Sequence, residues 1–341
     1  MRTPLPLADS LKQSTNCDGL MLSFRALVTI SRPLFWFNTA VPYAWGWLAS
    51  GRPLDMPTVV LILYFTLPFN LLLHGVNDIF DYESDLRNAR KNSAEGALLV
   101  NPGNFRRLVL LIAAWNVPAI LALLLLGSGA AIAAFVGLVA LSIAYSAPPR
   151  LKGRPGLDSL SNVLYAGSLL VSVLANGATP TPWATVGAFA LWAIASHAFT
   201  AIQDLPADAA AGIRTVAVAL GAVPTALVAL ALYATGAFLL RGIATPILSI
   251  LFALYAALVA AFLLGGRSFD LAHRLYRVFF SANIVAGAGI SLALIWQQRP
   301  LIPWPVAGAL MMVLTILTGA ALSWVTWQRV SEHGQAAKGG A

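Results

Sequence analysis

The stretch Asn77-Asp78-Ile79-Phe80-Asp81-Tyr82-Glu83-Ser84-Asp85 decides how the rest of the chain is interpreted. It places four acidic residues at the end of a long apolar segment, in a chain of which only 10% is charged. An acid at the end of a membrane helix is costly unless it meets water, a counter-charge or a metal ion. A helical continuation would place Asp78, Asp81 and Asp85 on one face, where their repulsion requires a cation. Hard oxygen donors predict Mg²⁺, and a solvated acidic loop is the simpler alternative.

The composition predicts a membrane protein. Of the 341 residues 59% are hydrophobic, and the mean hydropathy is +0.78. We therefore expect an all-α, polytopic transmembrane bundle. Residues 1–24 and 328–341 are expected to be cytoplasmic tails, 25–297 the main transmembrane domain and 298–327 an additional C-terminal span. The expected bundle has nine to ten spans, drawn from ten apolar segments: 33–50, 57–77, 105–127, 129–146, 158–176, 183–203, 216–240, 245–264, 276–297 and 303–326.

The charges follow the same division of the chain. The net charge is +8, and most Lys and Arg residues fall in the long connections after every second segment. Only Arg52, Arg241 and Arg299 fall on the other side. The positive-inside rule accounts for this bias without a nucleic-acid partner. It predicts an integral protein of the cell membrane with an even number of spans, and it places both termini and the acidic loops in the cytoplasm.

A second acidic motif, Gln203-Asp204-Leu205-Pro206-Ala207-Asp208, follows four segments after the first. Asp204 and Asp208 stand four residues apart and can share a helical face. The interval predicts two four-helix repeats around a central cavity. Two carboxylate clusters facing each other there could hold two Mg²⁺ ions with a diphosphate between them. The alternative is that Asp204 and Asp208 are ordinary acidic residues at a helix end beside Pro206, without a ligand.

The loop Tyr145-Ser-Ala-Pro-Pro-Arg-Leu-Lys-Gly-Arg-Pro155 lies between the two motifs. Its prolines predict an extended, stiff loop. Arg150, Lys152 and Arg154 can stabilise the charge of a leaving diphosphate, although a positive-inside anchor suffices to explain Arg150. His74 and His197 precede the two motifs, and either can line a cavity or simply pack between helices.

The three motifs together, in their order and spacing, resemble the UbiA superfamily of intramembrane prenyltransferases. Within this superfamily the sequence is most similar to the lycopene elongase branch, which makes C50 carotenoids. The similarity lies in residues 77–85, Arg87 to Gly96 and 145–161. The resemblance implies Mg²⁺ and a prenyl diphosphate held by Asn77, Asp78, Asp81, Asp85, Asp204 and Asp208. It also implies diphosphate binding by Lys152 and Arg154, catalysis by Tyr145, Lys152 and Asp204, and a substrate-facing first helix with Arg32 and Asn38.

The implied reaction is ionisation of an allylic diphosphate, expected to be dimethylallyl, and capture of the carbocation by a lipid-soluble acceptor. We expect the end of a lycopene-like polyene that enters from membrane lipid, because an anionic acceptor needs a buried cation and Arg32 is the only obvious spare one. Prenylation of an aromatic acceptor, such as 4-hydroxybenzoate or a quinone or chlorophyll precursor, is the alternative. Two functions of other classes also stay open: the protein could be a transporter or a non-catalytic membrane scaffold. The acceptor's identity, the prenyl length and the oligomeric state do not follow from the sequence.

Overall fold

The computed structural model describes residues 22–85, 101–178, 182–241, 246–298, 300 and 303–339. The expected N-terminal tail up to residue 21, the loop 86–100 and Arg299 lie outside these ranges. In the described residues all regular structure is helical, as expected. The first half contains α2 (Phe24–Ile30), α3 (Phe37–Ser50), α4 (Met56–Tyr64), α5 (Leu67–Phe80), α6 (Tyr82–Asp85), α7 (Phe105–Leu126), α8 (Gly129–Ser146), α9 (Leu157–Leu160) and α10 (Leu164–Asn176). The second half contains α11 (Trp183–Ala210), α12 (Val216–Leu220), α13 (Ala222–Leu239), α14 (Pro246–Leu264), α15 (Phe269–Gln297) and α16 (Trp304–Gly339).

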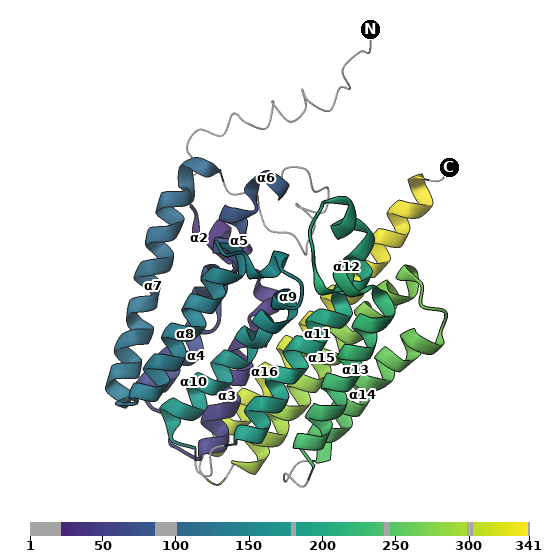
Figure 1. Ribbon diagram of the computed structural model, residues 1–341. Coiled ribbons are helices and arrows are strands. Elements are labelled where there is room, and N and C mark those ends of the chain that lie inside the picture. The colour runs from purple at the N-terminus through teal and green to yellow at the C-terminus, as the bar shows by residue number, and fades with distance from the viewer. Residues whose placement is uncertain are drawn as a thin grey trace.

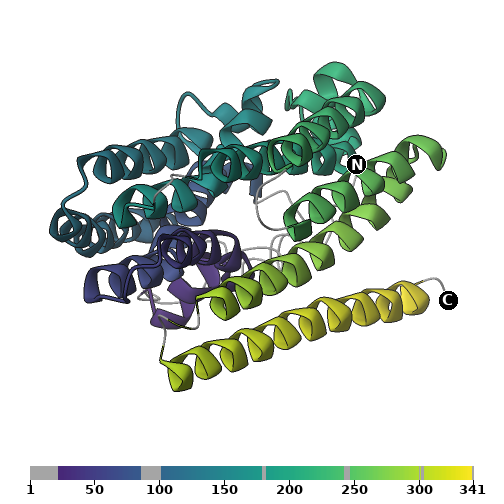
Figure 2. The same cartoon turned by 90° about the horizontal axis from the view of Figure 1, so that it is seen from below.

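Two hydrophobic cores divide the bundle between α10 and α11. The first is built from residues between Leu27 and Ala175, and the second from residues between Ala188 and Phe279. In the first half α10 packs on α3 and α8, and in the second half α13 packs on α11 and α14. Figures 1 and 2 show the two groups of helices side by side. The bundle of two helical halves expected from the sequence is confirmed.

Seven helical segments of the described chain are long and apolar enough to cross a membrane: Met56–Phe80, Pro102–Leu126, Gly129–Ser146, Leu157–Asn176, Trp183–Ala210, Ala222–Leu239 and Phe269–Gln297. The apolar helices Leu248–Leu264 and Trp304–Ala320 are shorter. The expected first span, α3, has 14 residues and contains Pro42. The expected segments therefore correspond to helices, of unequal length.

The span Met56–Phe80 bends at Phe65 and Thr66. Pro68 lies in the first turn of α5, a position that suits its missing N–H. The carbonyl groups at the bend are satisfied by side chains, because Asn70 Nδ2 donates to Thr66 O at 2.7 Å and Thr39 Oγ1 donates to Phe65 O at 2.6 Å. An unpaired carbonyl would be costly in hydrocarbon, so these bonds stabilise the bend.

The elements next to both acidic motifs lie at one end of the bundle. In Figure 1, α6 and α12 occupy the same end, together with the C-terminal end of α16. α16 packs against α15 and runs alongside the bundle in Figure 2. Its 36 residues span about 54 Å, which exceeds the thickness of a bilayer. The helix therefore continues beyond residue 327, where the expected span ended.

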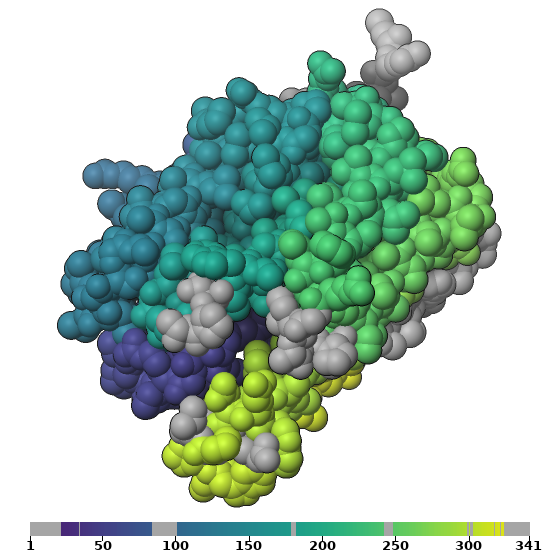
Figure 3. Space-filling model, turned by 60° about the horizontal axis from the view of Figure 1, so that its bottom comes forward, coloured from purple at the N-terminus to yellow at the C-terminus, as the bar shows by residue number. Residues whose placement is uncertain are grey.

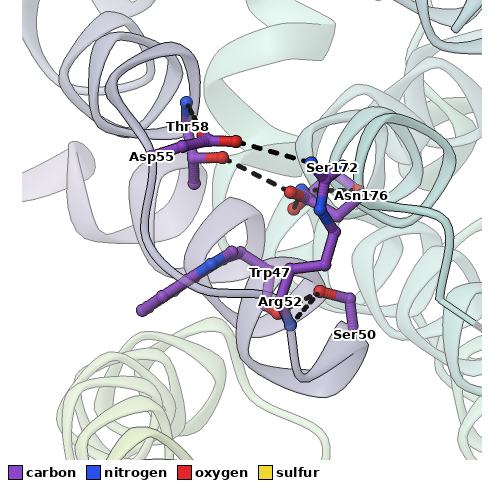
Figure 4. Close-up of polar contacts among 7 residues, drawn as sticks. All are labelled: Trp47, Ser50, Arg52, Asp55, Thr58, Ser172 and Asn176. Carbon is purple, nitrogen blue, oxygen red and sulfur yellow. Dashed lines mark hydrogen bonds and ion pairs between the residues drawn. The ribbon is translucent and has the colours of Figure 1, made fainter. Parts of the chain in front are cut away.

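The turn between α3 and α4 lies at the opposite end, and polar side chains tie it to α10 (Figure 4). Asp55 accepts from the Thr58 N–H at 2.9 Å, and Thr58 Oγ1 donates to Asn176 Oδ1 at 3.4 Å. Partial burial acts to raise the pKa of Asp55, but the hydrogen bonds from Thr58 and the charge of Arg52 outweigh it and leave that pKa below its ordinary value. This cluster fixes the far end of α4 against α10.

Candidate active site at the acidic end of the bundle

The first motif is neutralised by an arginine from the first helical segment. Arg32 Nη2 donates to Asp78 Oδ1 at 2.9 Å, and the Asp78 side chain is only 2% exposed. Arg32 has a φ of 51°, the left-handed conformation that a non-glycine residue rarely adopts. Such strain is typical of residues whose position matters for function. Arg32 is therefore paired with Asp78, and its predicted role in substrate binding stays a prediction.

Asp81 is held by the loop between the two motifs. Arg150 Nη2 donates to Asp81 Oδ1 at 2.9 Å, and Lys152 Nζ donates to Asp81 Oδ2. Arg150, like Arg32, has a positive φ, of 55°. Arg150 thus contacts the first motif, which a role as membrane anchor does not require. Arg154, by contrast, is exposed.

Two local expectations are corrected here. α5 ends at Phe80 with Asp81 as its C-cap, and α6 starts at Tyr82, so Asp78, Asp81 and Asp85 do not share one continuous helix. The Asp81 side chain instead points to the neighbouring loop, where Arg150 and Lys152 bind its carboxylate. That loop is not extended: the Arg150 N–H donates to Ala147 O at 2.7 Å across a turn containing the cis Pro148–Pro149 peptide, and a 3₁₀ turn, Leu151–Gly153, follows.

Asn77 and Tyr145 link the first motif to α8. Asn77 Nδ2 donates to the Oγ of the buried Ser146 at 3.0 Å. Tyr145 lies in the last turn of α8 and is partly accessible. The charges of Asp81 and Asp158 both reach its hydroxyl. Both predicted residues thus lie beside the first motif.

The second motif lies within α11. The helix runs through Pro206 to Ala210, seven residues beyond the expected end of the span at 203. Asp204 and Asp208 therefore keep the one-turn separation that places them on one face. Asp208 Oδ2 accepts from Thr215 Oγ1, the N-cap of α12, at 3.3 Å. The connection after α11 is thereby folded back onto the motif.

Asp158 and Ser159, which the sequence did not single out, bring α9 to His197 and to the second motif. Ser159 Oγ lies 3.1 Å from Nδ1 of His197, and the charges of Asp158 and Asp204 both reach that imidazole. The carboxylate of Asp158, on α9 of the first half, also accepts from the Val216 N–H of α12 at 2.9 Å, so this cluster joins the two halves. Asp158 was identifiable only as one more acid in a charged loop, and its burial depends on tertiary packing.

A second missed cluster sits at the start of α15. His273 Nδ1 lies 2.8 Å from Gln203 Oε1, and its Nε2 lies 3.1 Å from Arg277 Nη2. Gln203 directly precedes Asp204, so α15 supplies a cation close to the second motif. The only sequence signal was a His and an Arg four residues apart.

The donor chemistry of the motifs fits Mg²⁺, since all the acids offer hard oxygen ligands. In the part of the chain that the structure describes, no three His, Cys, Asp or Glu side chains gather closely enough to hold a metal ion. Asp78 and Asp81 face arginine and lysine instead. The side chain of Asp85 lies outside the described residues. The predicted metal set thus stays a prediction.

An elongated apolar cavity of about 280 Å³ runs between the two halves. It is lined by Phe37 and Asn38 at one end of α3 and by Ala49 at the other, which are about 17 Å apart along the helix axis. Phe189, Trp192 and Tyr255 form an aromatic wall in the other half. In Figure 3 the surface is hollowed between the purple N-terminal and yellow-green C-terminal segments. The predicted substrate-facing position of Asn38 agrees with this cavity.

Comparison with known proteins identifies the family. The sequence profile of the UbiA prenyltransferase family matches residues 39–284. The chain belongs to the UbiA prenyltransferase family. It is 32% identical over 283 residues to the lycopene elongase/hydratase of Corynebacterium glutamicum, which covers 81% of this chain and 98% of that protein. It is 35% identical over 276 residues to the lycopene elongase/hydratase of Haloarcula japonica, covering 79% of this chain and 91% of the relative.

Solved structures agree on the fold. A UbiA homologue of Archaeoglobus fulgidus bound to DMAPP and Mg²⁺ superimposes with a TM-score of 0.59 at 19% identity, over 77% of this chain and 99% of that one. The apo UbiA homologue of Aeropyrum pernix gives 0.57 at 22% identity, over 76% and 98%. This UbiA-family protein is therefore an integral membrane prenyltransferase.

Proposed function

We propose that this prenyltransferase transfers a dimethylallyl group from its diphosphate to the end of a long polyene of the lycopene type. The observation that carries the proposal is the elongated apolar cavity, which extends from Phe37 and Asn38 in the interior of the bundle toward the end opposite the acidic motifs. A five-carbon donor does not need a cavity about 17 Å long, so the acceptor must be the long substrate. The relatives named lycopene elongase/hydratase support the same acceptor.

The diphosphate lies at the acidic end. Arg150 and Lys152 from the loop are the groups best placed to bind its oxygens, because both already reach the first motif. Asp78, Asp81, Asp85, Asp204 and Asp208 would hold Mg²⁺, which when bound neutralises charge on the leaving diphosphate. The homologue of Archaeoglobus fulgidus bound to DMAPP and Mg²⁺ supports this assignment.

The chemistry is an electrophilic alkylation. The allylic C–O bond breaks, and its electron pair leaves with the diphosphate. The terminal double bond of the polyene then supplies the electron pair of the new C–C bond. Tyr145 precedes Ser146, which accepts from Asn77 of the first motif, and its ring can stabilise the cation by cation–π contact. The apolar walls exclude water from the allylic cation.

The polyene is favoured over an aromatic acid by the charge inventory of the site. A buried carboxylate needs a cationic partner, and Arg32, the candidate partner, is bonded to Asp78. The cavity volume of about 280 Å³ is at the lower limit for small-molecule pockets. One end of the polyene therefore enters the cavity while the remainder stays in the lipid.

The test is a competition assay. Purified protein in lipid receives dimethylallyl diphosphate, Mg²⁺, lycopene and 4-hydroxybenzoate, and the products are separated by mass. We expect five-carbon additions to lycopene and unaltered benzoate. Parallel reactions with geranyl and geranylgeranyl diphosphate test the donor length, and Asp204→Asn is the inactive control. Prenylated benzoate with untouched lycopene would overturn the acceptor assignment.

We propose further that the acidic end faces the cytoplasm, because the basic residues gather on that side of the chain. Cysteines introduced at Gly153 and Gly51, in a Cys17→Ser background, should react with an impermeant thiol reagent from opposite faces of sealed vesicles. Reaction of both from the same face would contradict this orientation.

A further inference from the structure

A buried polar cluster lies next to the start of α12, beside the second acidic motif. Asp158 is fully buried, and its Oδ2 accepts from the Val216 N–H at 2.9 Å. Among the described residues its Oδ1 has no hydrogen-bond partner. The neighbouring Ser159 Oγ lies 3.1 Å from Nδ1 of His197. These groups belong to neither motif, and such buried polar atoms are expensive without a ligand.

The position of His197 on α11 relates this cluster to the reaction. His197 and Asp204 are seven residues apart, so they share a helical face and are separated by about 10 Å along the axis. His197 therefore lies below the level of the diphosphate, toward the middle of the bundle. His197 is partly accessible, as are Tyr145 on α8 and Tyr165 on α10.

We propose that His197 accepts the proton released when water quenches the carbocation left on the alkylated polyene. This inference rests on the proposed function. Attack by the terminal double bond leaves a positive charge on its more substituted carbon. A water oxygen forms a C–O bond to that carbon, one of its O–H bonds breaks, and the proton passes to Nε2 of His197. The product is a tertiary alcohol.

The cluster supplies what this step requires. A buried water needs two to four polar partners, and Asp158 Oδ1 offers one buried acceptor. In the tautomer whose Nδ1–H donates to Ser159 Oγ, Nε2 carries the lone pair and acts as the base. The negative charges of Asp158 and Asp204 partly offset the cost of burying the imidazolium that forms. Tyr145 is the other titratable group within reach of Asp158.

The first half offers a matched comparison. His74 precedes Asp81 by seven residues, as His197 precedes Asp204. Its ring, however, is buried and packs against Phe35 at a centroid distance of 5.5 Å. Substitution of His74 tests the loss of a buried histidine at the equivalent position without removing the base.

The experiment measures two products of the same reaction in lipid, with dimethylallyl diphosphate, Mg²⁺ and lycopene. Diphosphate release reports ionisation, and mass spectrometry reports the fraction of elongated polyene that carries a hydroxyl. For His197→Gln we expect diphosphate release to continue while the hydroxylated fraction falls about tenfold or more, replaced by alkene and dimethylallyl alcohol. Ser159→Ala should shift the ratio in the same direction by less, and His74→Gln should leave the ratio unchanged.

An unchanged product ratio in His197→Gln overturns the inference, as does a wild-type product without hydroxyl. If His197→Gln does not fold, Ser159→Ala decides by the same ratio. Wild-type protein that leaves lycopene untouched overturns the proposed function, which separates the two failures.

Discussion

The Arg32–Asp78 ion pair predicts a measurable and strongly non-additive loss of stability. Removing one partner of a buried pair costs about 3–5 kcal/mol. The Asp78 side chain is 2% exposed and that of Arg32 is 21% exposed, so we expect about 3 kcal/mol for Arg32→Ala. Arg32→Gly should cost about 1 kcal/mol less, because glycine adopts the φ of 51° without strain.

Thermal unfolding in detergent, without Mg²⁺ or substrate, measures these differences. At roughly 2 °C per kcal/mol for a large chain, Arg32→Ala should lower the Tm by about 6 °C. Asp78→Asn removes the charge that Arg32 faces, so the double variant should be more stable than the sum of the single effects by about 2 kcal/mol. Additive effects, or a glycine variant less stable than the alanine variant, would refute the buried-pair reasoning.

Three further predictions concern other parts of the molecule. Arg150→Ala should weaken binding of the prenyl diphosphate by about tenfold, the value of one charge-assisted contact, in a titration that follows ligand binding directly; an unchanged affinity would return Arg150 to a role as anchor. Gly287→Ala places a Cβ against the Phe37 ring inside the cavity. It should therefore raise KM for the polyene about tenfold and leave KM for the diphosphate unchanged. The control Gly289→Ala, whose Cβ meets no described atom within 4 Å, should change neither constant. Asp55 has a lowered pKa in the folded protein, so its contribution to stability is present above its unfolded pKa of about 4 and is lost as the pH falls through the folded value; Asp55→Asn should flatten the acid limb of the stability curve, and equal acid sensitivity of both proteins would contradict the assignment.

Most of the architecture could be predicted because it depends on local properties of the chain. The length of each apolar segment selects a helix, and the order of the charged connections divides the segments into two halves. The first motif, the second motif and the loop at Tyr145 were recognisable from residue type and spacing alone. Even the bend at Phe65 has a local cause in Pro68.

The sequence by itself thus determined a two-part helical membrane bundle and the position of both acidic motifs along the chain. Tertiary structure decided which basic side chain pairs with which acidic one. The end of α5 at Asp81, the reach of Arg150 to that residue and the pairing of Arg32 with Asp78 depend on segments 46 to 69 residues apart. The same holds for Asp158 and Ser159 on α9 and His197 on α11, which meet only when the two halves pack. The physical reason is that burial and electrostatic partners are properties of three-dimensional packing, whereas helix formation in a membrane is a property of the local segment.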